Sequence, residues 1–275
     1  MGFLLAAGGS LFALAAVASA QDRPIPDAPT LLREVQAHQR DMAAVRENYT
    51  FHRKRAEDEL DKKGAVTKTT TQEREIFFVN GRQVGHLVSR NGVALNAAEQ
   101  KKEDARVREV VETITKNASK TERRPQRSDL VSEMLAVAKT SNPRRVSFNG
   151  RSTLVFDFTG DPRAEAHGLA ENGLKKAEGT VWIDEADRQV TRIEAHLYDN
   201  FRIGGGLLAS VQKGSHIVLE QALVGQGLWL PKSSEQSVDA RIVVKGAHIR
   251  VHEEDFDFKR FNVETLQQLG APISQ

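Results

Sequence analysis

Cysteine is absent from the 275 residues of this chain. Its absence excludes disulfide bonds, thiolate metal sites and cysteine nucleophiles, and it excludes the lipid-modified cysteine of an anchored bacterial lipoprotein. An excess of one charge is also missing, because the formal net charge is only +2, too small to indicate a nucleic-acid partner. Hydrophobic residues at 39% and charged residues at 28% instead indicate a soluble globular protein with a packed core.

Complete catalytic and metal-binding motifs are missing as well. The stretch 157–161, "DFTGD", is interrupted by Phe158 relative to the Asp-Thr-Gly of aspartic proteases and has no second copy, although a carboxylate dyad needs two such loops. The glycines at 204–206 lack the Lys-Ser/Thr pair and the helix of a phosphate-binding loop. His248 and His252 lie in alternating β sequence, where residues four apart are about 13 Å from each other. We therefore predict no catalytic residue, no cofactor and no metal site.

The N-terminal segment predicts export. Residues 1–20 contain no charged side chain and end in Ala18, Ser19 and Ala20 before Gln21. Small residues at this boundary are typical of a signal-peptidase site, so we predict a signal peptide at 1–20. A membrane anchor is the alternative, because twenty uncharged residues can span a bilayer, and the lack of a preceding Lys or Arg is unusual for a signal peptide. The prolines within 21–30 then predict a linker.

The next part of the chain predicts one helix followed by an antiparallel meander. Apolar and histidine side chains recur at helical spacing from Leu31 to Met42, so a helix is expected from Leu31 to about Asn48. Three strand-like stretches follow up to residue 90. Asn-Gly pairs at 80–81 and 91–92 predict tight turns after the second and third of them, since both central residues of such a turn need positive φ.

A helical insert is predicted at about 97–139. Its first helix, Ala97 to about Thr115, carries valine and isoleucine at helical spacing, so one side of it can pack on the sheet. A second helix is expected at Asp129–Lys139, with Ser128 as its N-cap. The charged run from Lys101 to Arg127 is typical of a solvated helix face, and transient contact with a membrane surface is the alternative.

The remaining sequence predicts strands almost to its end. A hairpin is expected about Asn149–Gly150, and another lies within 176–199, where Val181 and Ile183 alternate with polar or aromatic neighbours. About ten long antiparallel strands must curl or close, and helices inserted into a meander cover one face of it. The predicted fold class is therefore α+β: a single curved antiparallel sheet, an incomplete β-barrel of about ten strands, with helices across its concave face.

Several stretches resemble a known family of folds. They are "GTVWIDEADRQVTRIEA" (179–195), "FRIGGGLLASVQKGSHIVLEQ" (201–221), "GLWLPKSSE" (227–235) and "DFDFKRF" (255–261). In these stretches the chain resembles the LolA/LolB lipoprotein carriers and, more nearly, exported proteins of acidobacterial type labelled as outer-membrane lipoprotein-sorting-like. The resemblance implies a LolA-like half-barrel domain over 31–275, a periplasmic location in a Gram-negative bacterium, and lipid or an acylated protein as partner. No site residue is carried over from it.

An apolar cavity is the candidate site. A curved sheet whose helices do not fill its concavity leaves an apolar space, which is the usual form of a lipid site. Each buried methylene of an acyl chain contributes about 0.8 kcal/mol, so non-enzymatic binding of lipid or lipoprotein acyl chains is the predicted function. The candidate lining residues come from several predicted strands, and each lies on the apolar side of its strand. They are Phe51, Phe77, Phe156, Phe158, Trp182, Ile193 and Leu197.

Two other functions stay open at this stage. If the helices fill the concavity, the protein is a closed periplasmic sensor or adaptor module that binds an envelope protein. A hydrolase is the second alternative, against which the missing motifs count. A large aromatic residue in mid-strand normally buries most of its area. We therefore expect Trp182 to be shielded and close to the helical insert.

Overall fold

The computed structural model describes residues 23–80, 82–118, 136–203, 209–225, 227–242 and 245–260. The predicted signal peptide at 1–20, most of the helix expected at Asp129–Lys139 and the glycines at 204–206 lie outside these ranges. In chain order the helices and strands are α1 (Ala28–Arg46), β1 (Tyr49–Leu60), β2 (Val66–Val79), β3 (Arg82–Arg90), β4 (Val93–Ala94), α2 (Ala97–Ala118), β5 (Ala138–Phe148), β6 (Arg151–Gly160), α4 (Leu169–Leu174), β7 (Ala177–Asp184), β8 (Gln189–Leu197), β9 (Phe201–Ile203), β10 (Ala209–Val211), β11 (His216–Leu223), β12 (Trp229–Ile242) and β13 (Lys245–Arg260).

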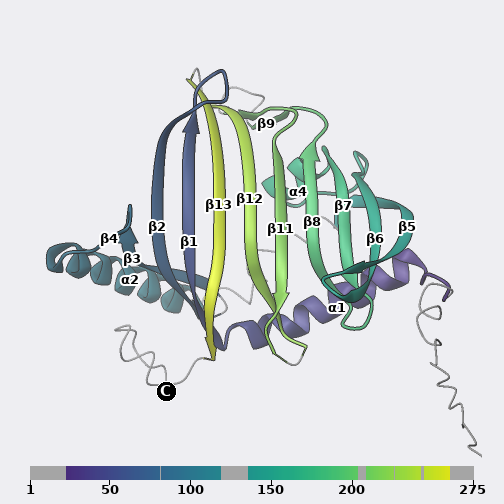
Figure 1. Cartoon of the computed structure of the whole chain (residues 1–275), viewed down its shortest axis with the longest axis horizontal. Coiled ribbons are helices and arrows are strands. Elements are labelled where there is room, and N and C mark those ends of the chain that lie inside the picture. Colours follow the sequence, from purple (N-terminus) through teal and green to yellow (C-terminus); the bar gives the residue numbers. More distant parts are fainter. Residues whose placement is uncertain are drawn as a thin grey trace, which may run out of the picture.

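The strands form one curved antiparallel sheet (Figure 1). Its main path runs in the order β4-β3-β2-β1-β13-β12-β11-β8-β7-β6-β5, and β9 and β10 extend it beside β12. The first and last strands of the chain therefore pair in mid-sheet, while β4 and β5 lie at opposite ends of the path. The sheet is open, as the prediction of an incomplete barrel in an α+β fold requires, and that prediction is confirmed.

The sheet has thirteen described strands rather than about ten. The difference lies in β4, β9 and β10, which contain two, three and three residues. A strand of this length does not show the alternation of apolar and polar side chains by which a strand is found in a sequence. The Asn-Gly prediction is confirmed at two hairpins, because Asn91, Gly92, Asn149 and Gly150 all have φ between 50° and 76°.

Two element boundaries differ from the prediction. Helix α1 begins at Ala28, because the Asp27 carboxylate caps it by accepting the Thr30 backbone N–H at 3.1 Å. The predicted linker at 21–30 therefore ends earlier. The helical insert predicted to reach residue 139 also ends earlier, since Ala138 pairs with Gly160 in the sheet. Strand pairing with a distant part of the chain here overrides local helical spacing.

Helix α1 covers one face of the sheet at β6, β7 and β8. Ten buried residues, two from the helix and eight from the strands, form a continuous cluster that we call the α1 layer: Leu31, Val35, Leu154, Phe156, Phe158, Val181, Ile183, Val190, Ile193 and Ala195. Helix α2 packs instead on the β2–β3 hairpin at the other end of the sheet, through Phe77, Val84, Val107, Val111 and Ile114. The two helices thus cover separate parts of the sheet (Figure 1).

The middle of the sheet is held by ion pairs between its first and last strands. The guanidinium of Arg53 on β1 donates two hydrogen bonds of 2.6 Å to Asp255 on β13. Two residues further along, Arg55 donates to Glu253 at 2.8 Å. Fork-shaped pairs of this kind are directional, so they fix the register of β1 against β13. They also make this part of the sheet polar where a continuous apolar cavity was expected.

Gly179 on β7 allows the close approach of β8. A Cβ atom at this position would overlap the carbonyl oxygen of Glu194, whereas one at Gly246 on β13 would meet nothing within 4 Å. We expect Gly179→Ala to lower the free energy of unfolding by about 1–3 kcal/mol, the usual cost of overpacking. Gly246→Ala is the matched control in a strand and should change it by less than about 0.5 kcal/mol. Equal urea midpoints for the two variants would contradict this packing.

Candidate functional site

The α1 layer is a larger buried apolar cluster than the one beneath α2, and it contains three of the predicted cavity residues. Its strand residues are almost completely buried, with Leu154, Phe156 and Ile183 between 0% and 1% exposed. Among the described side chains, the helix contributes Leu31 and Val35, both 0% exposed, and the partly buried Ala28 and Leu32 pack against the cluster as well. A wide apolar sheet face is therefore covered mainly by α1, with Ile25 before the helix and Leu174 of α4 packed against the same cluster.

Polar contacts attach α1 at two points along its length. Near its start, Glu34 accepts a hydrogen bond of 2.8 Å from Arg188, which lies in the turn between β7 and β8. Near its end, Arg46 donates to the backbone carbonyl of Trp229 at 3.3 Å and to the side chain of Gln39 at 3.0 Å. Next to the first of these points, the buried side chain of Val35 gives α1 an apolar contact with the sheet.

The buried side of α1 also carries unsatisfied polar atoms. The Nε2 atoms of His38 and Gln39 are buried and have no hydrogen-bond partner among the residues that the structure describes. A buried donor or acceptor without a partner costs about 1–3 kcal/mol. These two atoms therefore weaken the association of α1 with the sheet in the arrangement seen here.

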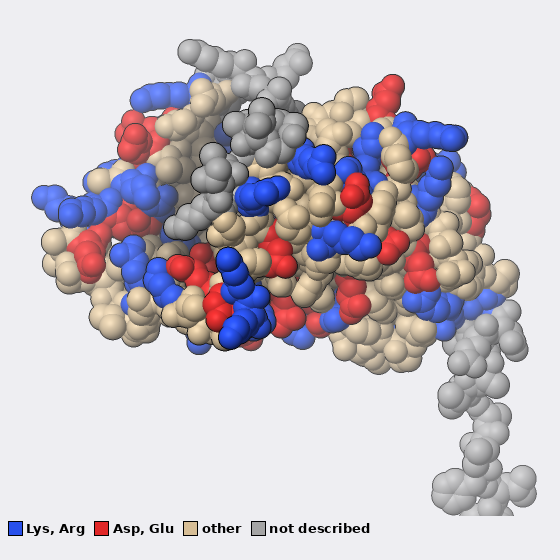
Figure 2. Space-filling view, turned by 90° about the horizontal axis from the view of Figure 1, so that it is seen from above, with Lys and Arg blue, Asp and Glu red and all other residues tan. Residues whose placement is uncertain are grey.

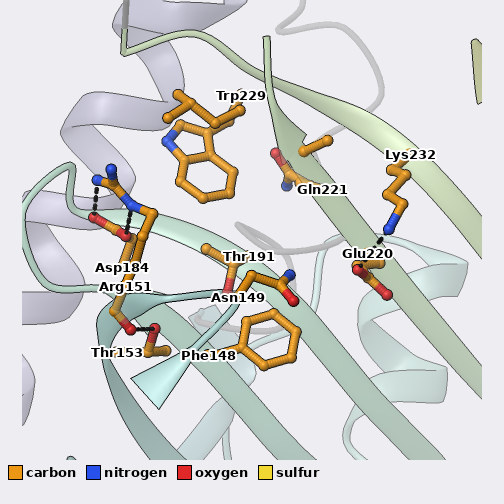
Figure 3. Close-up of a pocket in the computed structure, with 12 residues that line it drawn as sticks. Phe148, Asn149, Arg151, Thr153, Asp184, Thr191, Glu220, Gln221, Trp229 and Lys232 are labelled. Carbon is orange, nitrogen blue, oxygen red and sulfur yellow. Dashed lines mark hydrogen bonds and ion pairs between the residues drawn. The ribbon is translucent and has the colours of Figure 1, made fainter. Parts of the chain in front are cut away.

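A pocket of about 320 Å³ lies where three strand connections meet. The connections are those of β5 with β6, β7 with β8, and β11 with β12, and Figure 3 shows the side chains that project from them. We call this site the turn pocket. Its lining residues are Phe148, Asn149, Arg151, Thr153, Asp184, Thr191, Glu220, Gln221, Ala222, Leu223, Trp229 and Lys232.

The turn pocket lies on the sheet face opposite to α1. Thr153 and Asp184 line the pocket, while the residues next to them in the chain, Leu154 and Ile183, belong to the α1 layer. Successive side chains of a strand point to opposite faces. The pocket and the α1 layer are therefore two separate sites on the two sides of one sheet.

A hydrogen-bonded cluster forms one wall of the turn pocket (Figure 3). Arg151 donates to both oxygens of Asp184, at 2.5 and 2.9 Å, and to Asp187 at 2.8 Å. Asp187 also accepts the indole N–H of Trp229 at 2.9 Å, and the Arg151 guanidinium lies 5.7 Å from the centre of the Trp229 ring. The cluster joins all three connections and fixes their relative positions.

The protonation of this wall follows from the same contacts. Burial opposes ionisation of Asp184, but hydrogen bonds from Arg151 and from the backbone N–H groups of Asp187 and Ala186 outweigh it and lower the pKa of the Asp184 carboxyl. The carboxylate in turn raises the pKa of Arg151. Both groups are therefore charged at neutral pH, and neither is prepared to transfer a proton.

The other wall carries a second set of paired charges. Glu220 on β11 accepts from Lys232 at 3.1 Å and from Arg192 at 3.1 Å. Arg192 lies 5.7 Å from the centre of the Trp182 ring, which contacts Phe148 at 6.5 Å between ring centres. Each cation of the pocket is thus neutralised by a carboxylate within hydrogen-bond distance.

The predicted cavity residues do not lie together. Phe156, Phe158 and Ile193 meet in the α1 layer. Trp182 lies on the opposite face, Leu197 ends β8, and Phe77 packs under α2. Phe51 on β1 contacts Phe258, with 5.4 Å between ring centres. The structure therefore brings three of the seven candidates together, and a role for them in ligand binding stays a prediction.

The expected position of Trp182 near the helical insert is wrong for the described part of the insert. Trp182 lies on β7, between Val155 and Arg192 of its neighbouring strands. Helix α2 packs on β3 and β2, which are at the other end of the strand order. The error has a simple cause, because the sequence does not give the order in which strands pair across the sheet.

Catalytic groupings do not stand out in the described ranges. No group of three or more His, Asp or Glu side chains there is placed to hold a metal ion. His248 and His252 on β13 each face a carboxylate of β12, Asp239 at 2.7 Å and Glu235 at 3.6 Å.

Comparison with known proteins gives structural similarity alone. No protein-family model and no curated protein matches the chain. An outer membrane lipoprotein-sorting protein domain from Vibrio parahaemolyticus aligns at 9% identity over 83% of this chain and 92% of its own, with a TM-score of 0.34. A DUF1329 family protein from Desulfovibrio piger aligns at 12% identity over 84% and 93%, with a TM-score of 0.35. In the Pseudomonas aeruginosa MucA/MucB complex, one chain aligns at 12% identity over 86% and 97%, with a TM-score of 0.22. The chain is thus similar to a lipoprotein-sorting domain, as its sequence suggested, at a level that assigns it no family and no activity.

Proposed function

We propose that the protein binds an acyl chain, from a lipid or an acylated protein, between α1 and the face of β6–β8, and that it does so without catalysis. The α1 layer carries this proposal, because eight buried strand residues lie beneath one helix that contributes two fully buried and two partly buried apolar side chains. If α1 moves away from the sheet, an acyl chain can replace it over this surface. Binding would then hide the chain from water until it is passed to an acceptor.

The energetics support exchange between the helix and a ligand. Each methylene moved from water into the layer contributes about 0.8 kcal/mol, so ten carbons of acyl chain supply about 8 kcal/mol before the entropy of binding is subtracted. The opposing term is the association of α1, which the unsatisfied Nε2 atoms of His38 and Gln39 weaken. A ligand therefore has a weakened helix–sheet interaction to displace.

The proposed location is the periplasm of a Gram-negative bacterium, because the first twenty residues have the composition of a signal peptide and the sequence resembles the LolA/LolB carriers. None of the described helices is long and apolar enough to cross a membrane. Basic and acidic side chains are interspersed over the face shown in Figure 2. Such a mixed surface favours brief contact with lipid headgroups over permanent attachment.

Cross-linking α1 to the β7–β8 turn tests this proposal. The chain has no cysteine, so Glu34→Cys and Arg188→Cys together create one reactive pair at an existing contact of 2.8 Å. Joined by a short bis-maleimide, α1 cannot leave the sheet. We expect the joined protein to lose at least tenfold in affinity for the fluorescent fatty acid cis-parinaric acid, whereas the same variant without the linker keeps it.

A second cross-link controls for the chemistry. Glu59→Cys with Lys68→Cys replaces an exposed contact of 2.9 Å in the β1–β2 hairpin, and joining this pair should leave binding unchanged. Equal affinity before and after joining α1 would contradict entry beneath the helix. A wild-type protein that binds no acyl probe, and that carries no lipid by mass spectrometry after purification, would overturn acyl binding itself and favour the closed sensor or adaptor module.

A further inference from the structure

The turn pocket has no part in the acyl site, because it opens on the other face of the sheet. We propose that it binds one neutral, polyhydroxylated ring of the size of a monosaccharide unit. The volume of about 320 Å³ lies at the lower end of the range for small-molecule sites, about 300–1,000 Å³. A single ring of this size fits the space.

Charge balance selects a neutral ligand. Two cations, Arg151 and Lys232, and two carboxylates, Asp184 and Glu220, line the pocket. Each cation is paired with a carboxylate inside it, Arg151 with Asp184 at 2.5 Å and Lys232 with Glu220 at 3.1 Å. An anionic ligand would meet two fixed carboxylates, and a cationic ligand would meet two fixed cations, so either would bind against repulsion.

The unused hydrogen-bonding groups select hydroxyls. The Asn149 side chain has no hydrogen-bond partner within the described ranges, and Gln221 there uses only its oxygen, which accepts from Gln189 at 2.9 Å. One of the three N–H groups of Lys232 donates to Glu220. Glu220 keeps a free lone pair on each oxygen. A hydroxyl both donates and accepts, so adjacent hydroxyls of one ring can use an amide, an ammonium and a carboxylate together.

Apolar side chains complete the pocket. In Figure 3, Thr191 and Asn149 lie between the ring of Trp229 and the ring of Phe148. A sugar ring has C–H groups between its hydroxyls, and these need apolar contact once water is excluded. Aromatic and hydrogen-bonding side chains together line the pocket, which suits a ligand that presents both apolar and polar groups on one ring.

Trp229 provides the signal for a binding experiment. Its indole N–H is hydrogen bonded to Asp187 at 2.9 Å, so its resonance in a ¹H–¹⁵N spectrum reports on the pocket, and a Trp182→Phe variant identifies it. Methyl β-D-glucopyranoside and N-acetyl-D-glucosamine are the neutral probes, with glucose 6-phosphate as the anion and glucosamine at pH 6 as the cation. We expect a saturable shift of the Trp229 resonance with at least one neutral probe, and at least tenfold weaker binding of the phosphate and of glucosamine.

Matched asparagine variants locate the binding. Asn149→Gly removes the unpartnered amide at a backbone φ of 51°, which glycine adopts freely, and Asn80→Gly makes the same change at a φ of 46° at the remote end of β2. Loss of a hydrogen bond should weaken saccharide binding about tenfold in the first variant and not in the second. The proposal would be overturned if neither neutral saccharide bound, if the two variants bound it equally well, or if glucosamine or the phosphate bound more tightly.

Discussion

Replacing Phe156 by alanine is expected to lower the free energy of unfolding by about 3–5 kcal/mol, the usual cost of truncating a buried phenylalanine. The side chain is 1% exposed and lies in the middle of the α1 layer. Its removal leaves a cavity that neither the helix nor two paired strands can fill without moving. Urea denaturation of the mature protein, followed by tryptophan fluorescence, measures the change.

Phe256→Ala is the matched control for this variant. Phe256 is on β13 and is 38% exposed, so it has far less apolar surface to lose, and we expect a change of less than about 1 kcal/mol. If both phenylalanines proved equally important, the α1 layer would not be the dense cluster seen here. The layer would then be open to solvent in the absence of ligand.

The closed state of the α1 layer also decides how acyl binding can be tested. A Phe156→Glu variant would separate an open cavity, which tolerates the charge, from a filled core, which does not. With Phe156 at 1% exposure beneath α1, we expect this variant to unfold. Loss of probe binding would then say nothing about the site. Cross-linking Glu34 to Arg188 avoids this difficulty, because it restricts motion of the helix without disturbing the layer.

The elements that the sequence predicts well are those that depend on near neighbours. Asn149–Gly150 forms a tight turn because the conformation of two residues is enough to determine it. Val181, Ile183 and Ile193 belong to the core because alternation along a single strand separates the buried side from the other. The open α+β sheet follows from such local signals, added over many strands.

The candidate sites depend on strand order, which local signals do not contain. Asn149, Asp184 and Trp229 lie in different connections, and they meet only because β8 pairs with β11 and not with a nearer strand. Phe51 and Phe77 are separated for a related reason. Phe51 pairs with Ile76, so Phe77 points to the other face of β2. Parity within each strand was visible in the sequence, while the register between strands was not.

Replacing Asp184 by alanine is the second change with a large expected effect. Asp184 is 1% exposed, and it accepts two hydrogen bonds from Arg151 and one each from the backbone N–H groups of Ala186 and Asp187. Breaking a buried ion pair costs about 3–5 kcal/mol, and because about a third of Arg151 is exposed, we expect a loss near the lower end, about 3 kcal/mol. Asp199→Ala is the control, since its pair with Lys176 is exposed, and it should change stability by about 0–1 kcal/mol.

The pH dependence separates the charge of Asp184 from its packing. Burial opposes the ionisation of the Asp184 carboxyl, but hydrogen bonds to the carboxylate outweigh burial and lower its pKa in the folded protein. Its contribution to stability is therefore fully present above the pKa of the unfolded chain, about 3.9, and is lost as the pH falls through the still lower pKa of the folded state. We expect the difference in unfolding free energy between wild type and Asp184→Asn to stay constant from about pH 7 to pH 5 and to shrink below about pH 4. A difference that persisted unchanged in acid would assign the effect to shape and hydrogen bonding, and the paired charges of the turn pocket would then contribute little to holding its three connections together.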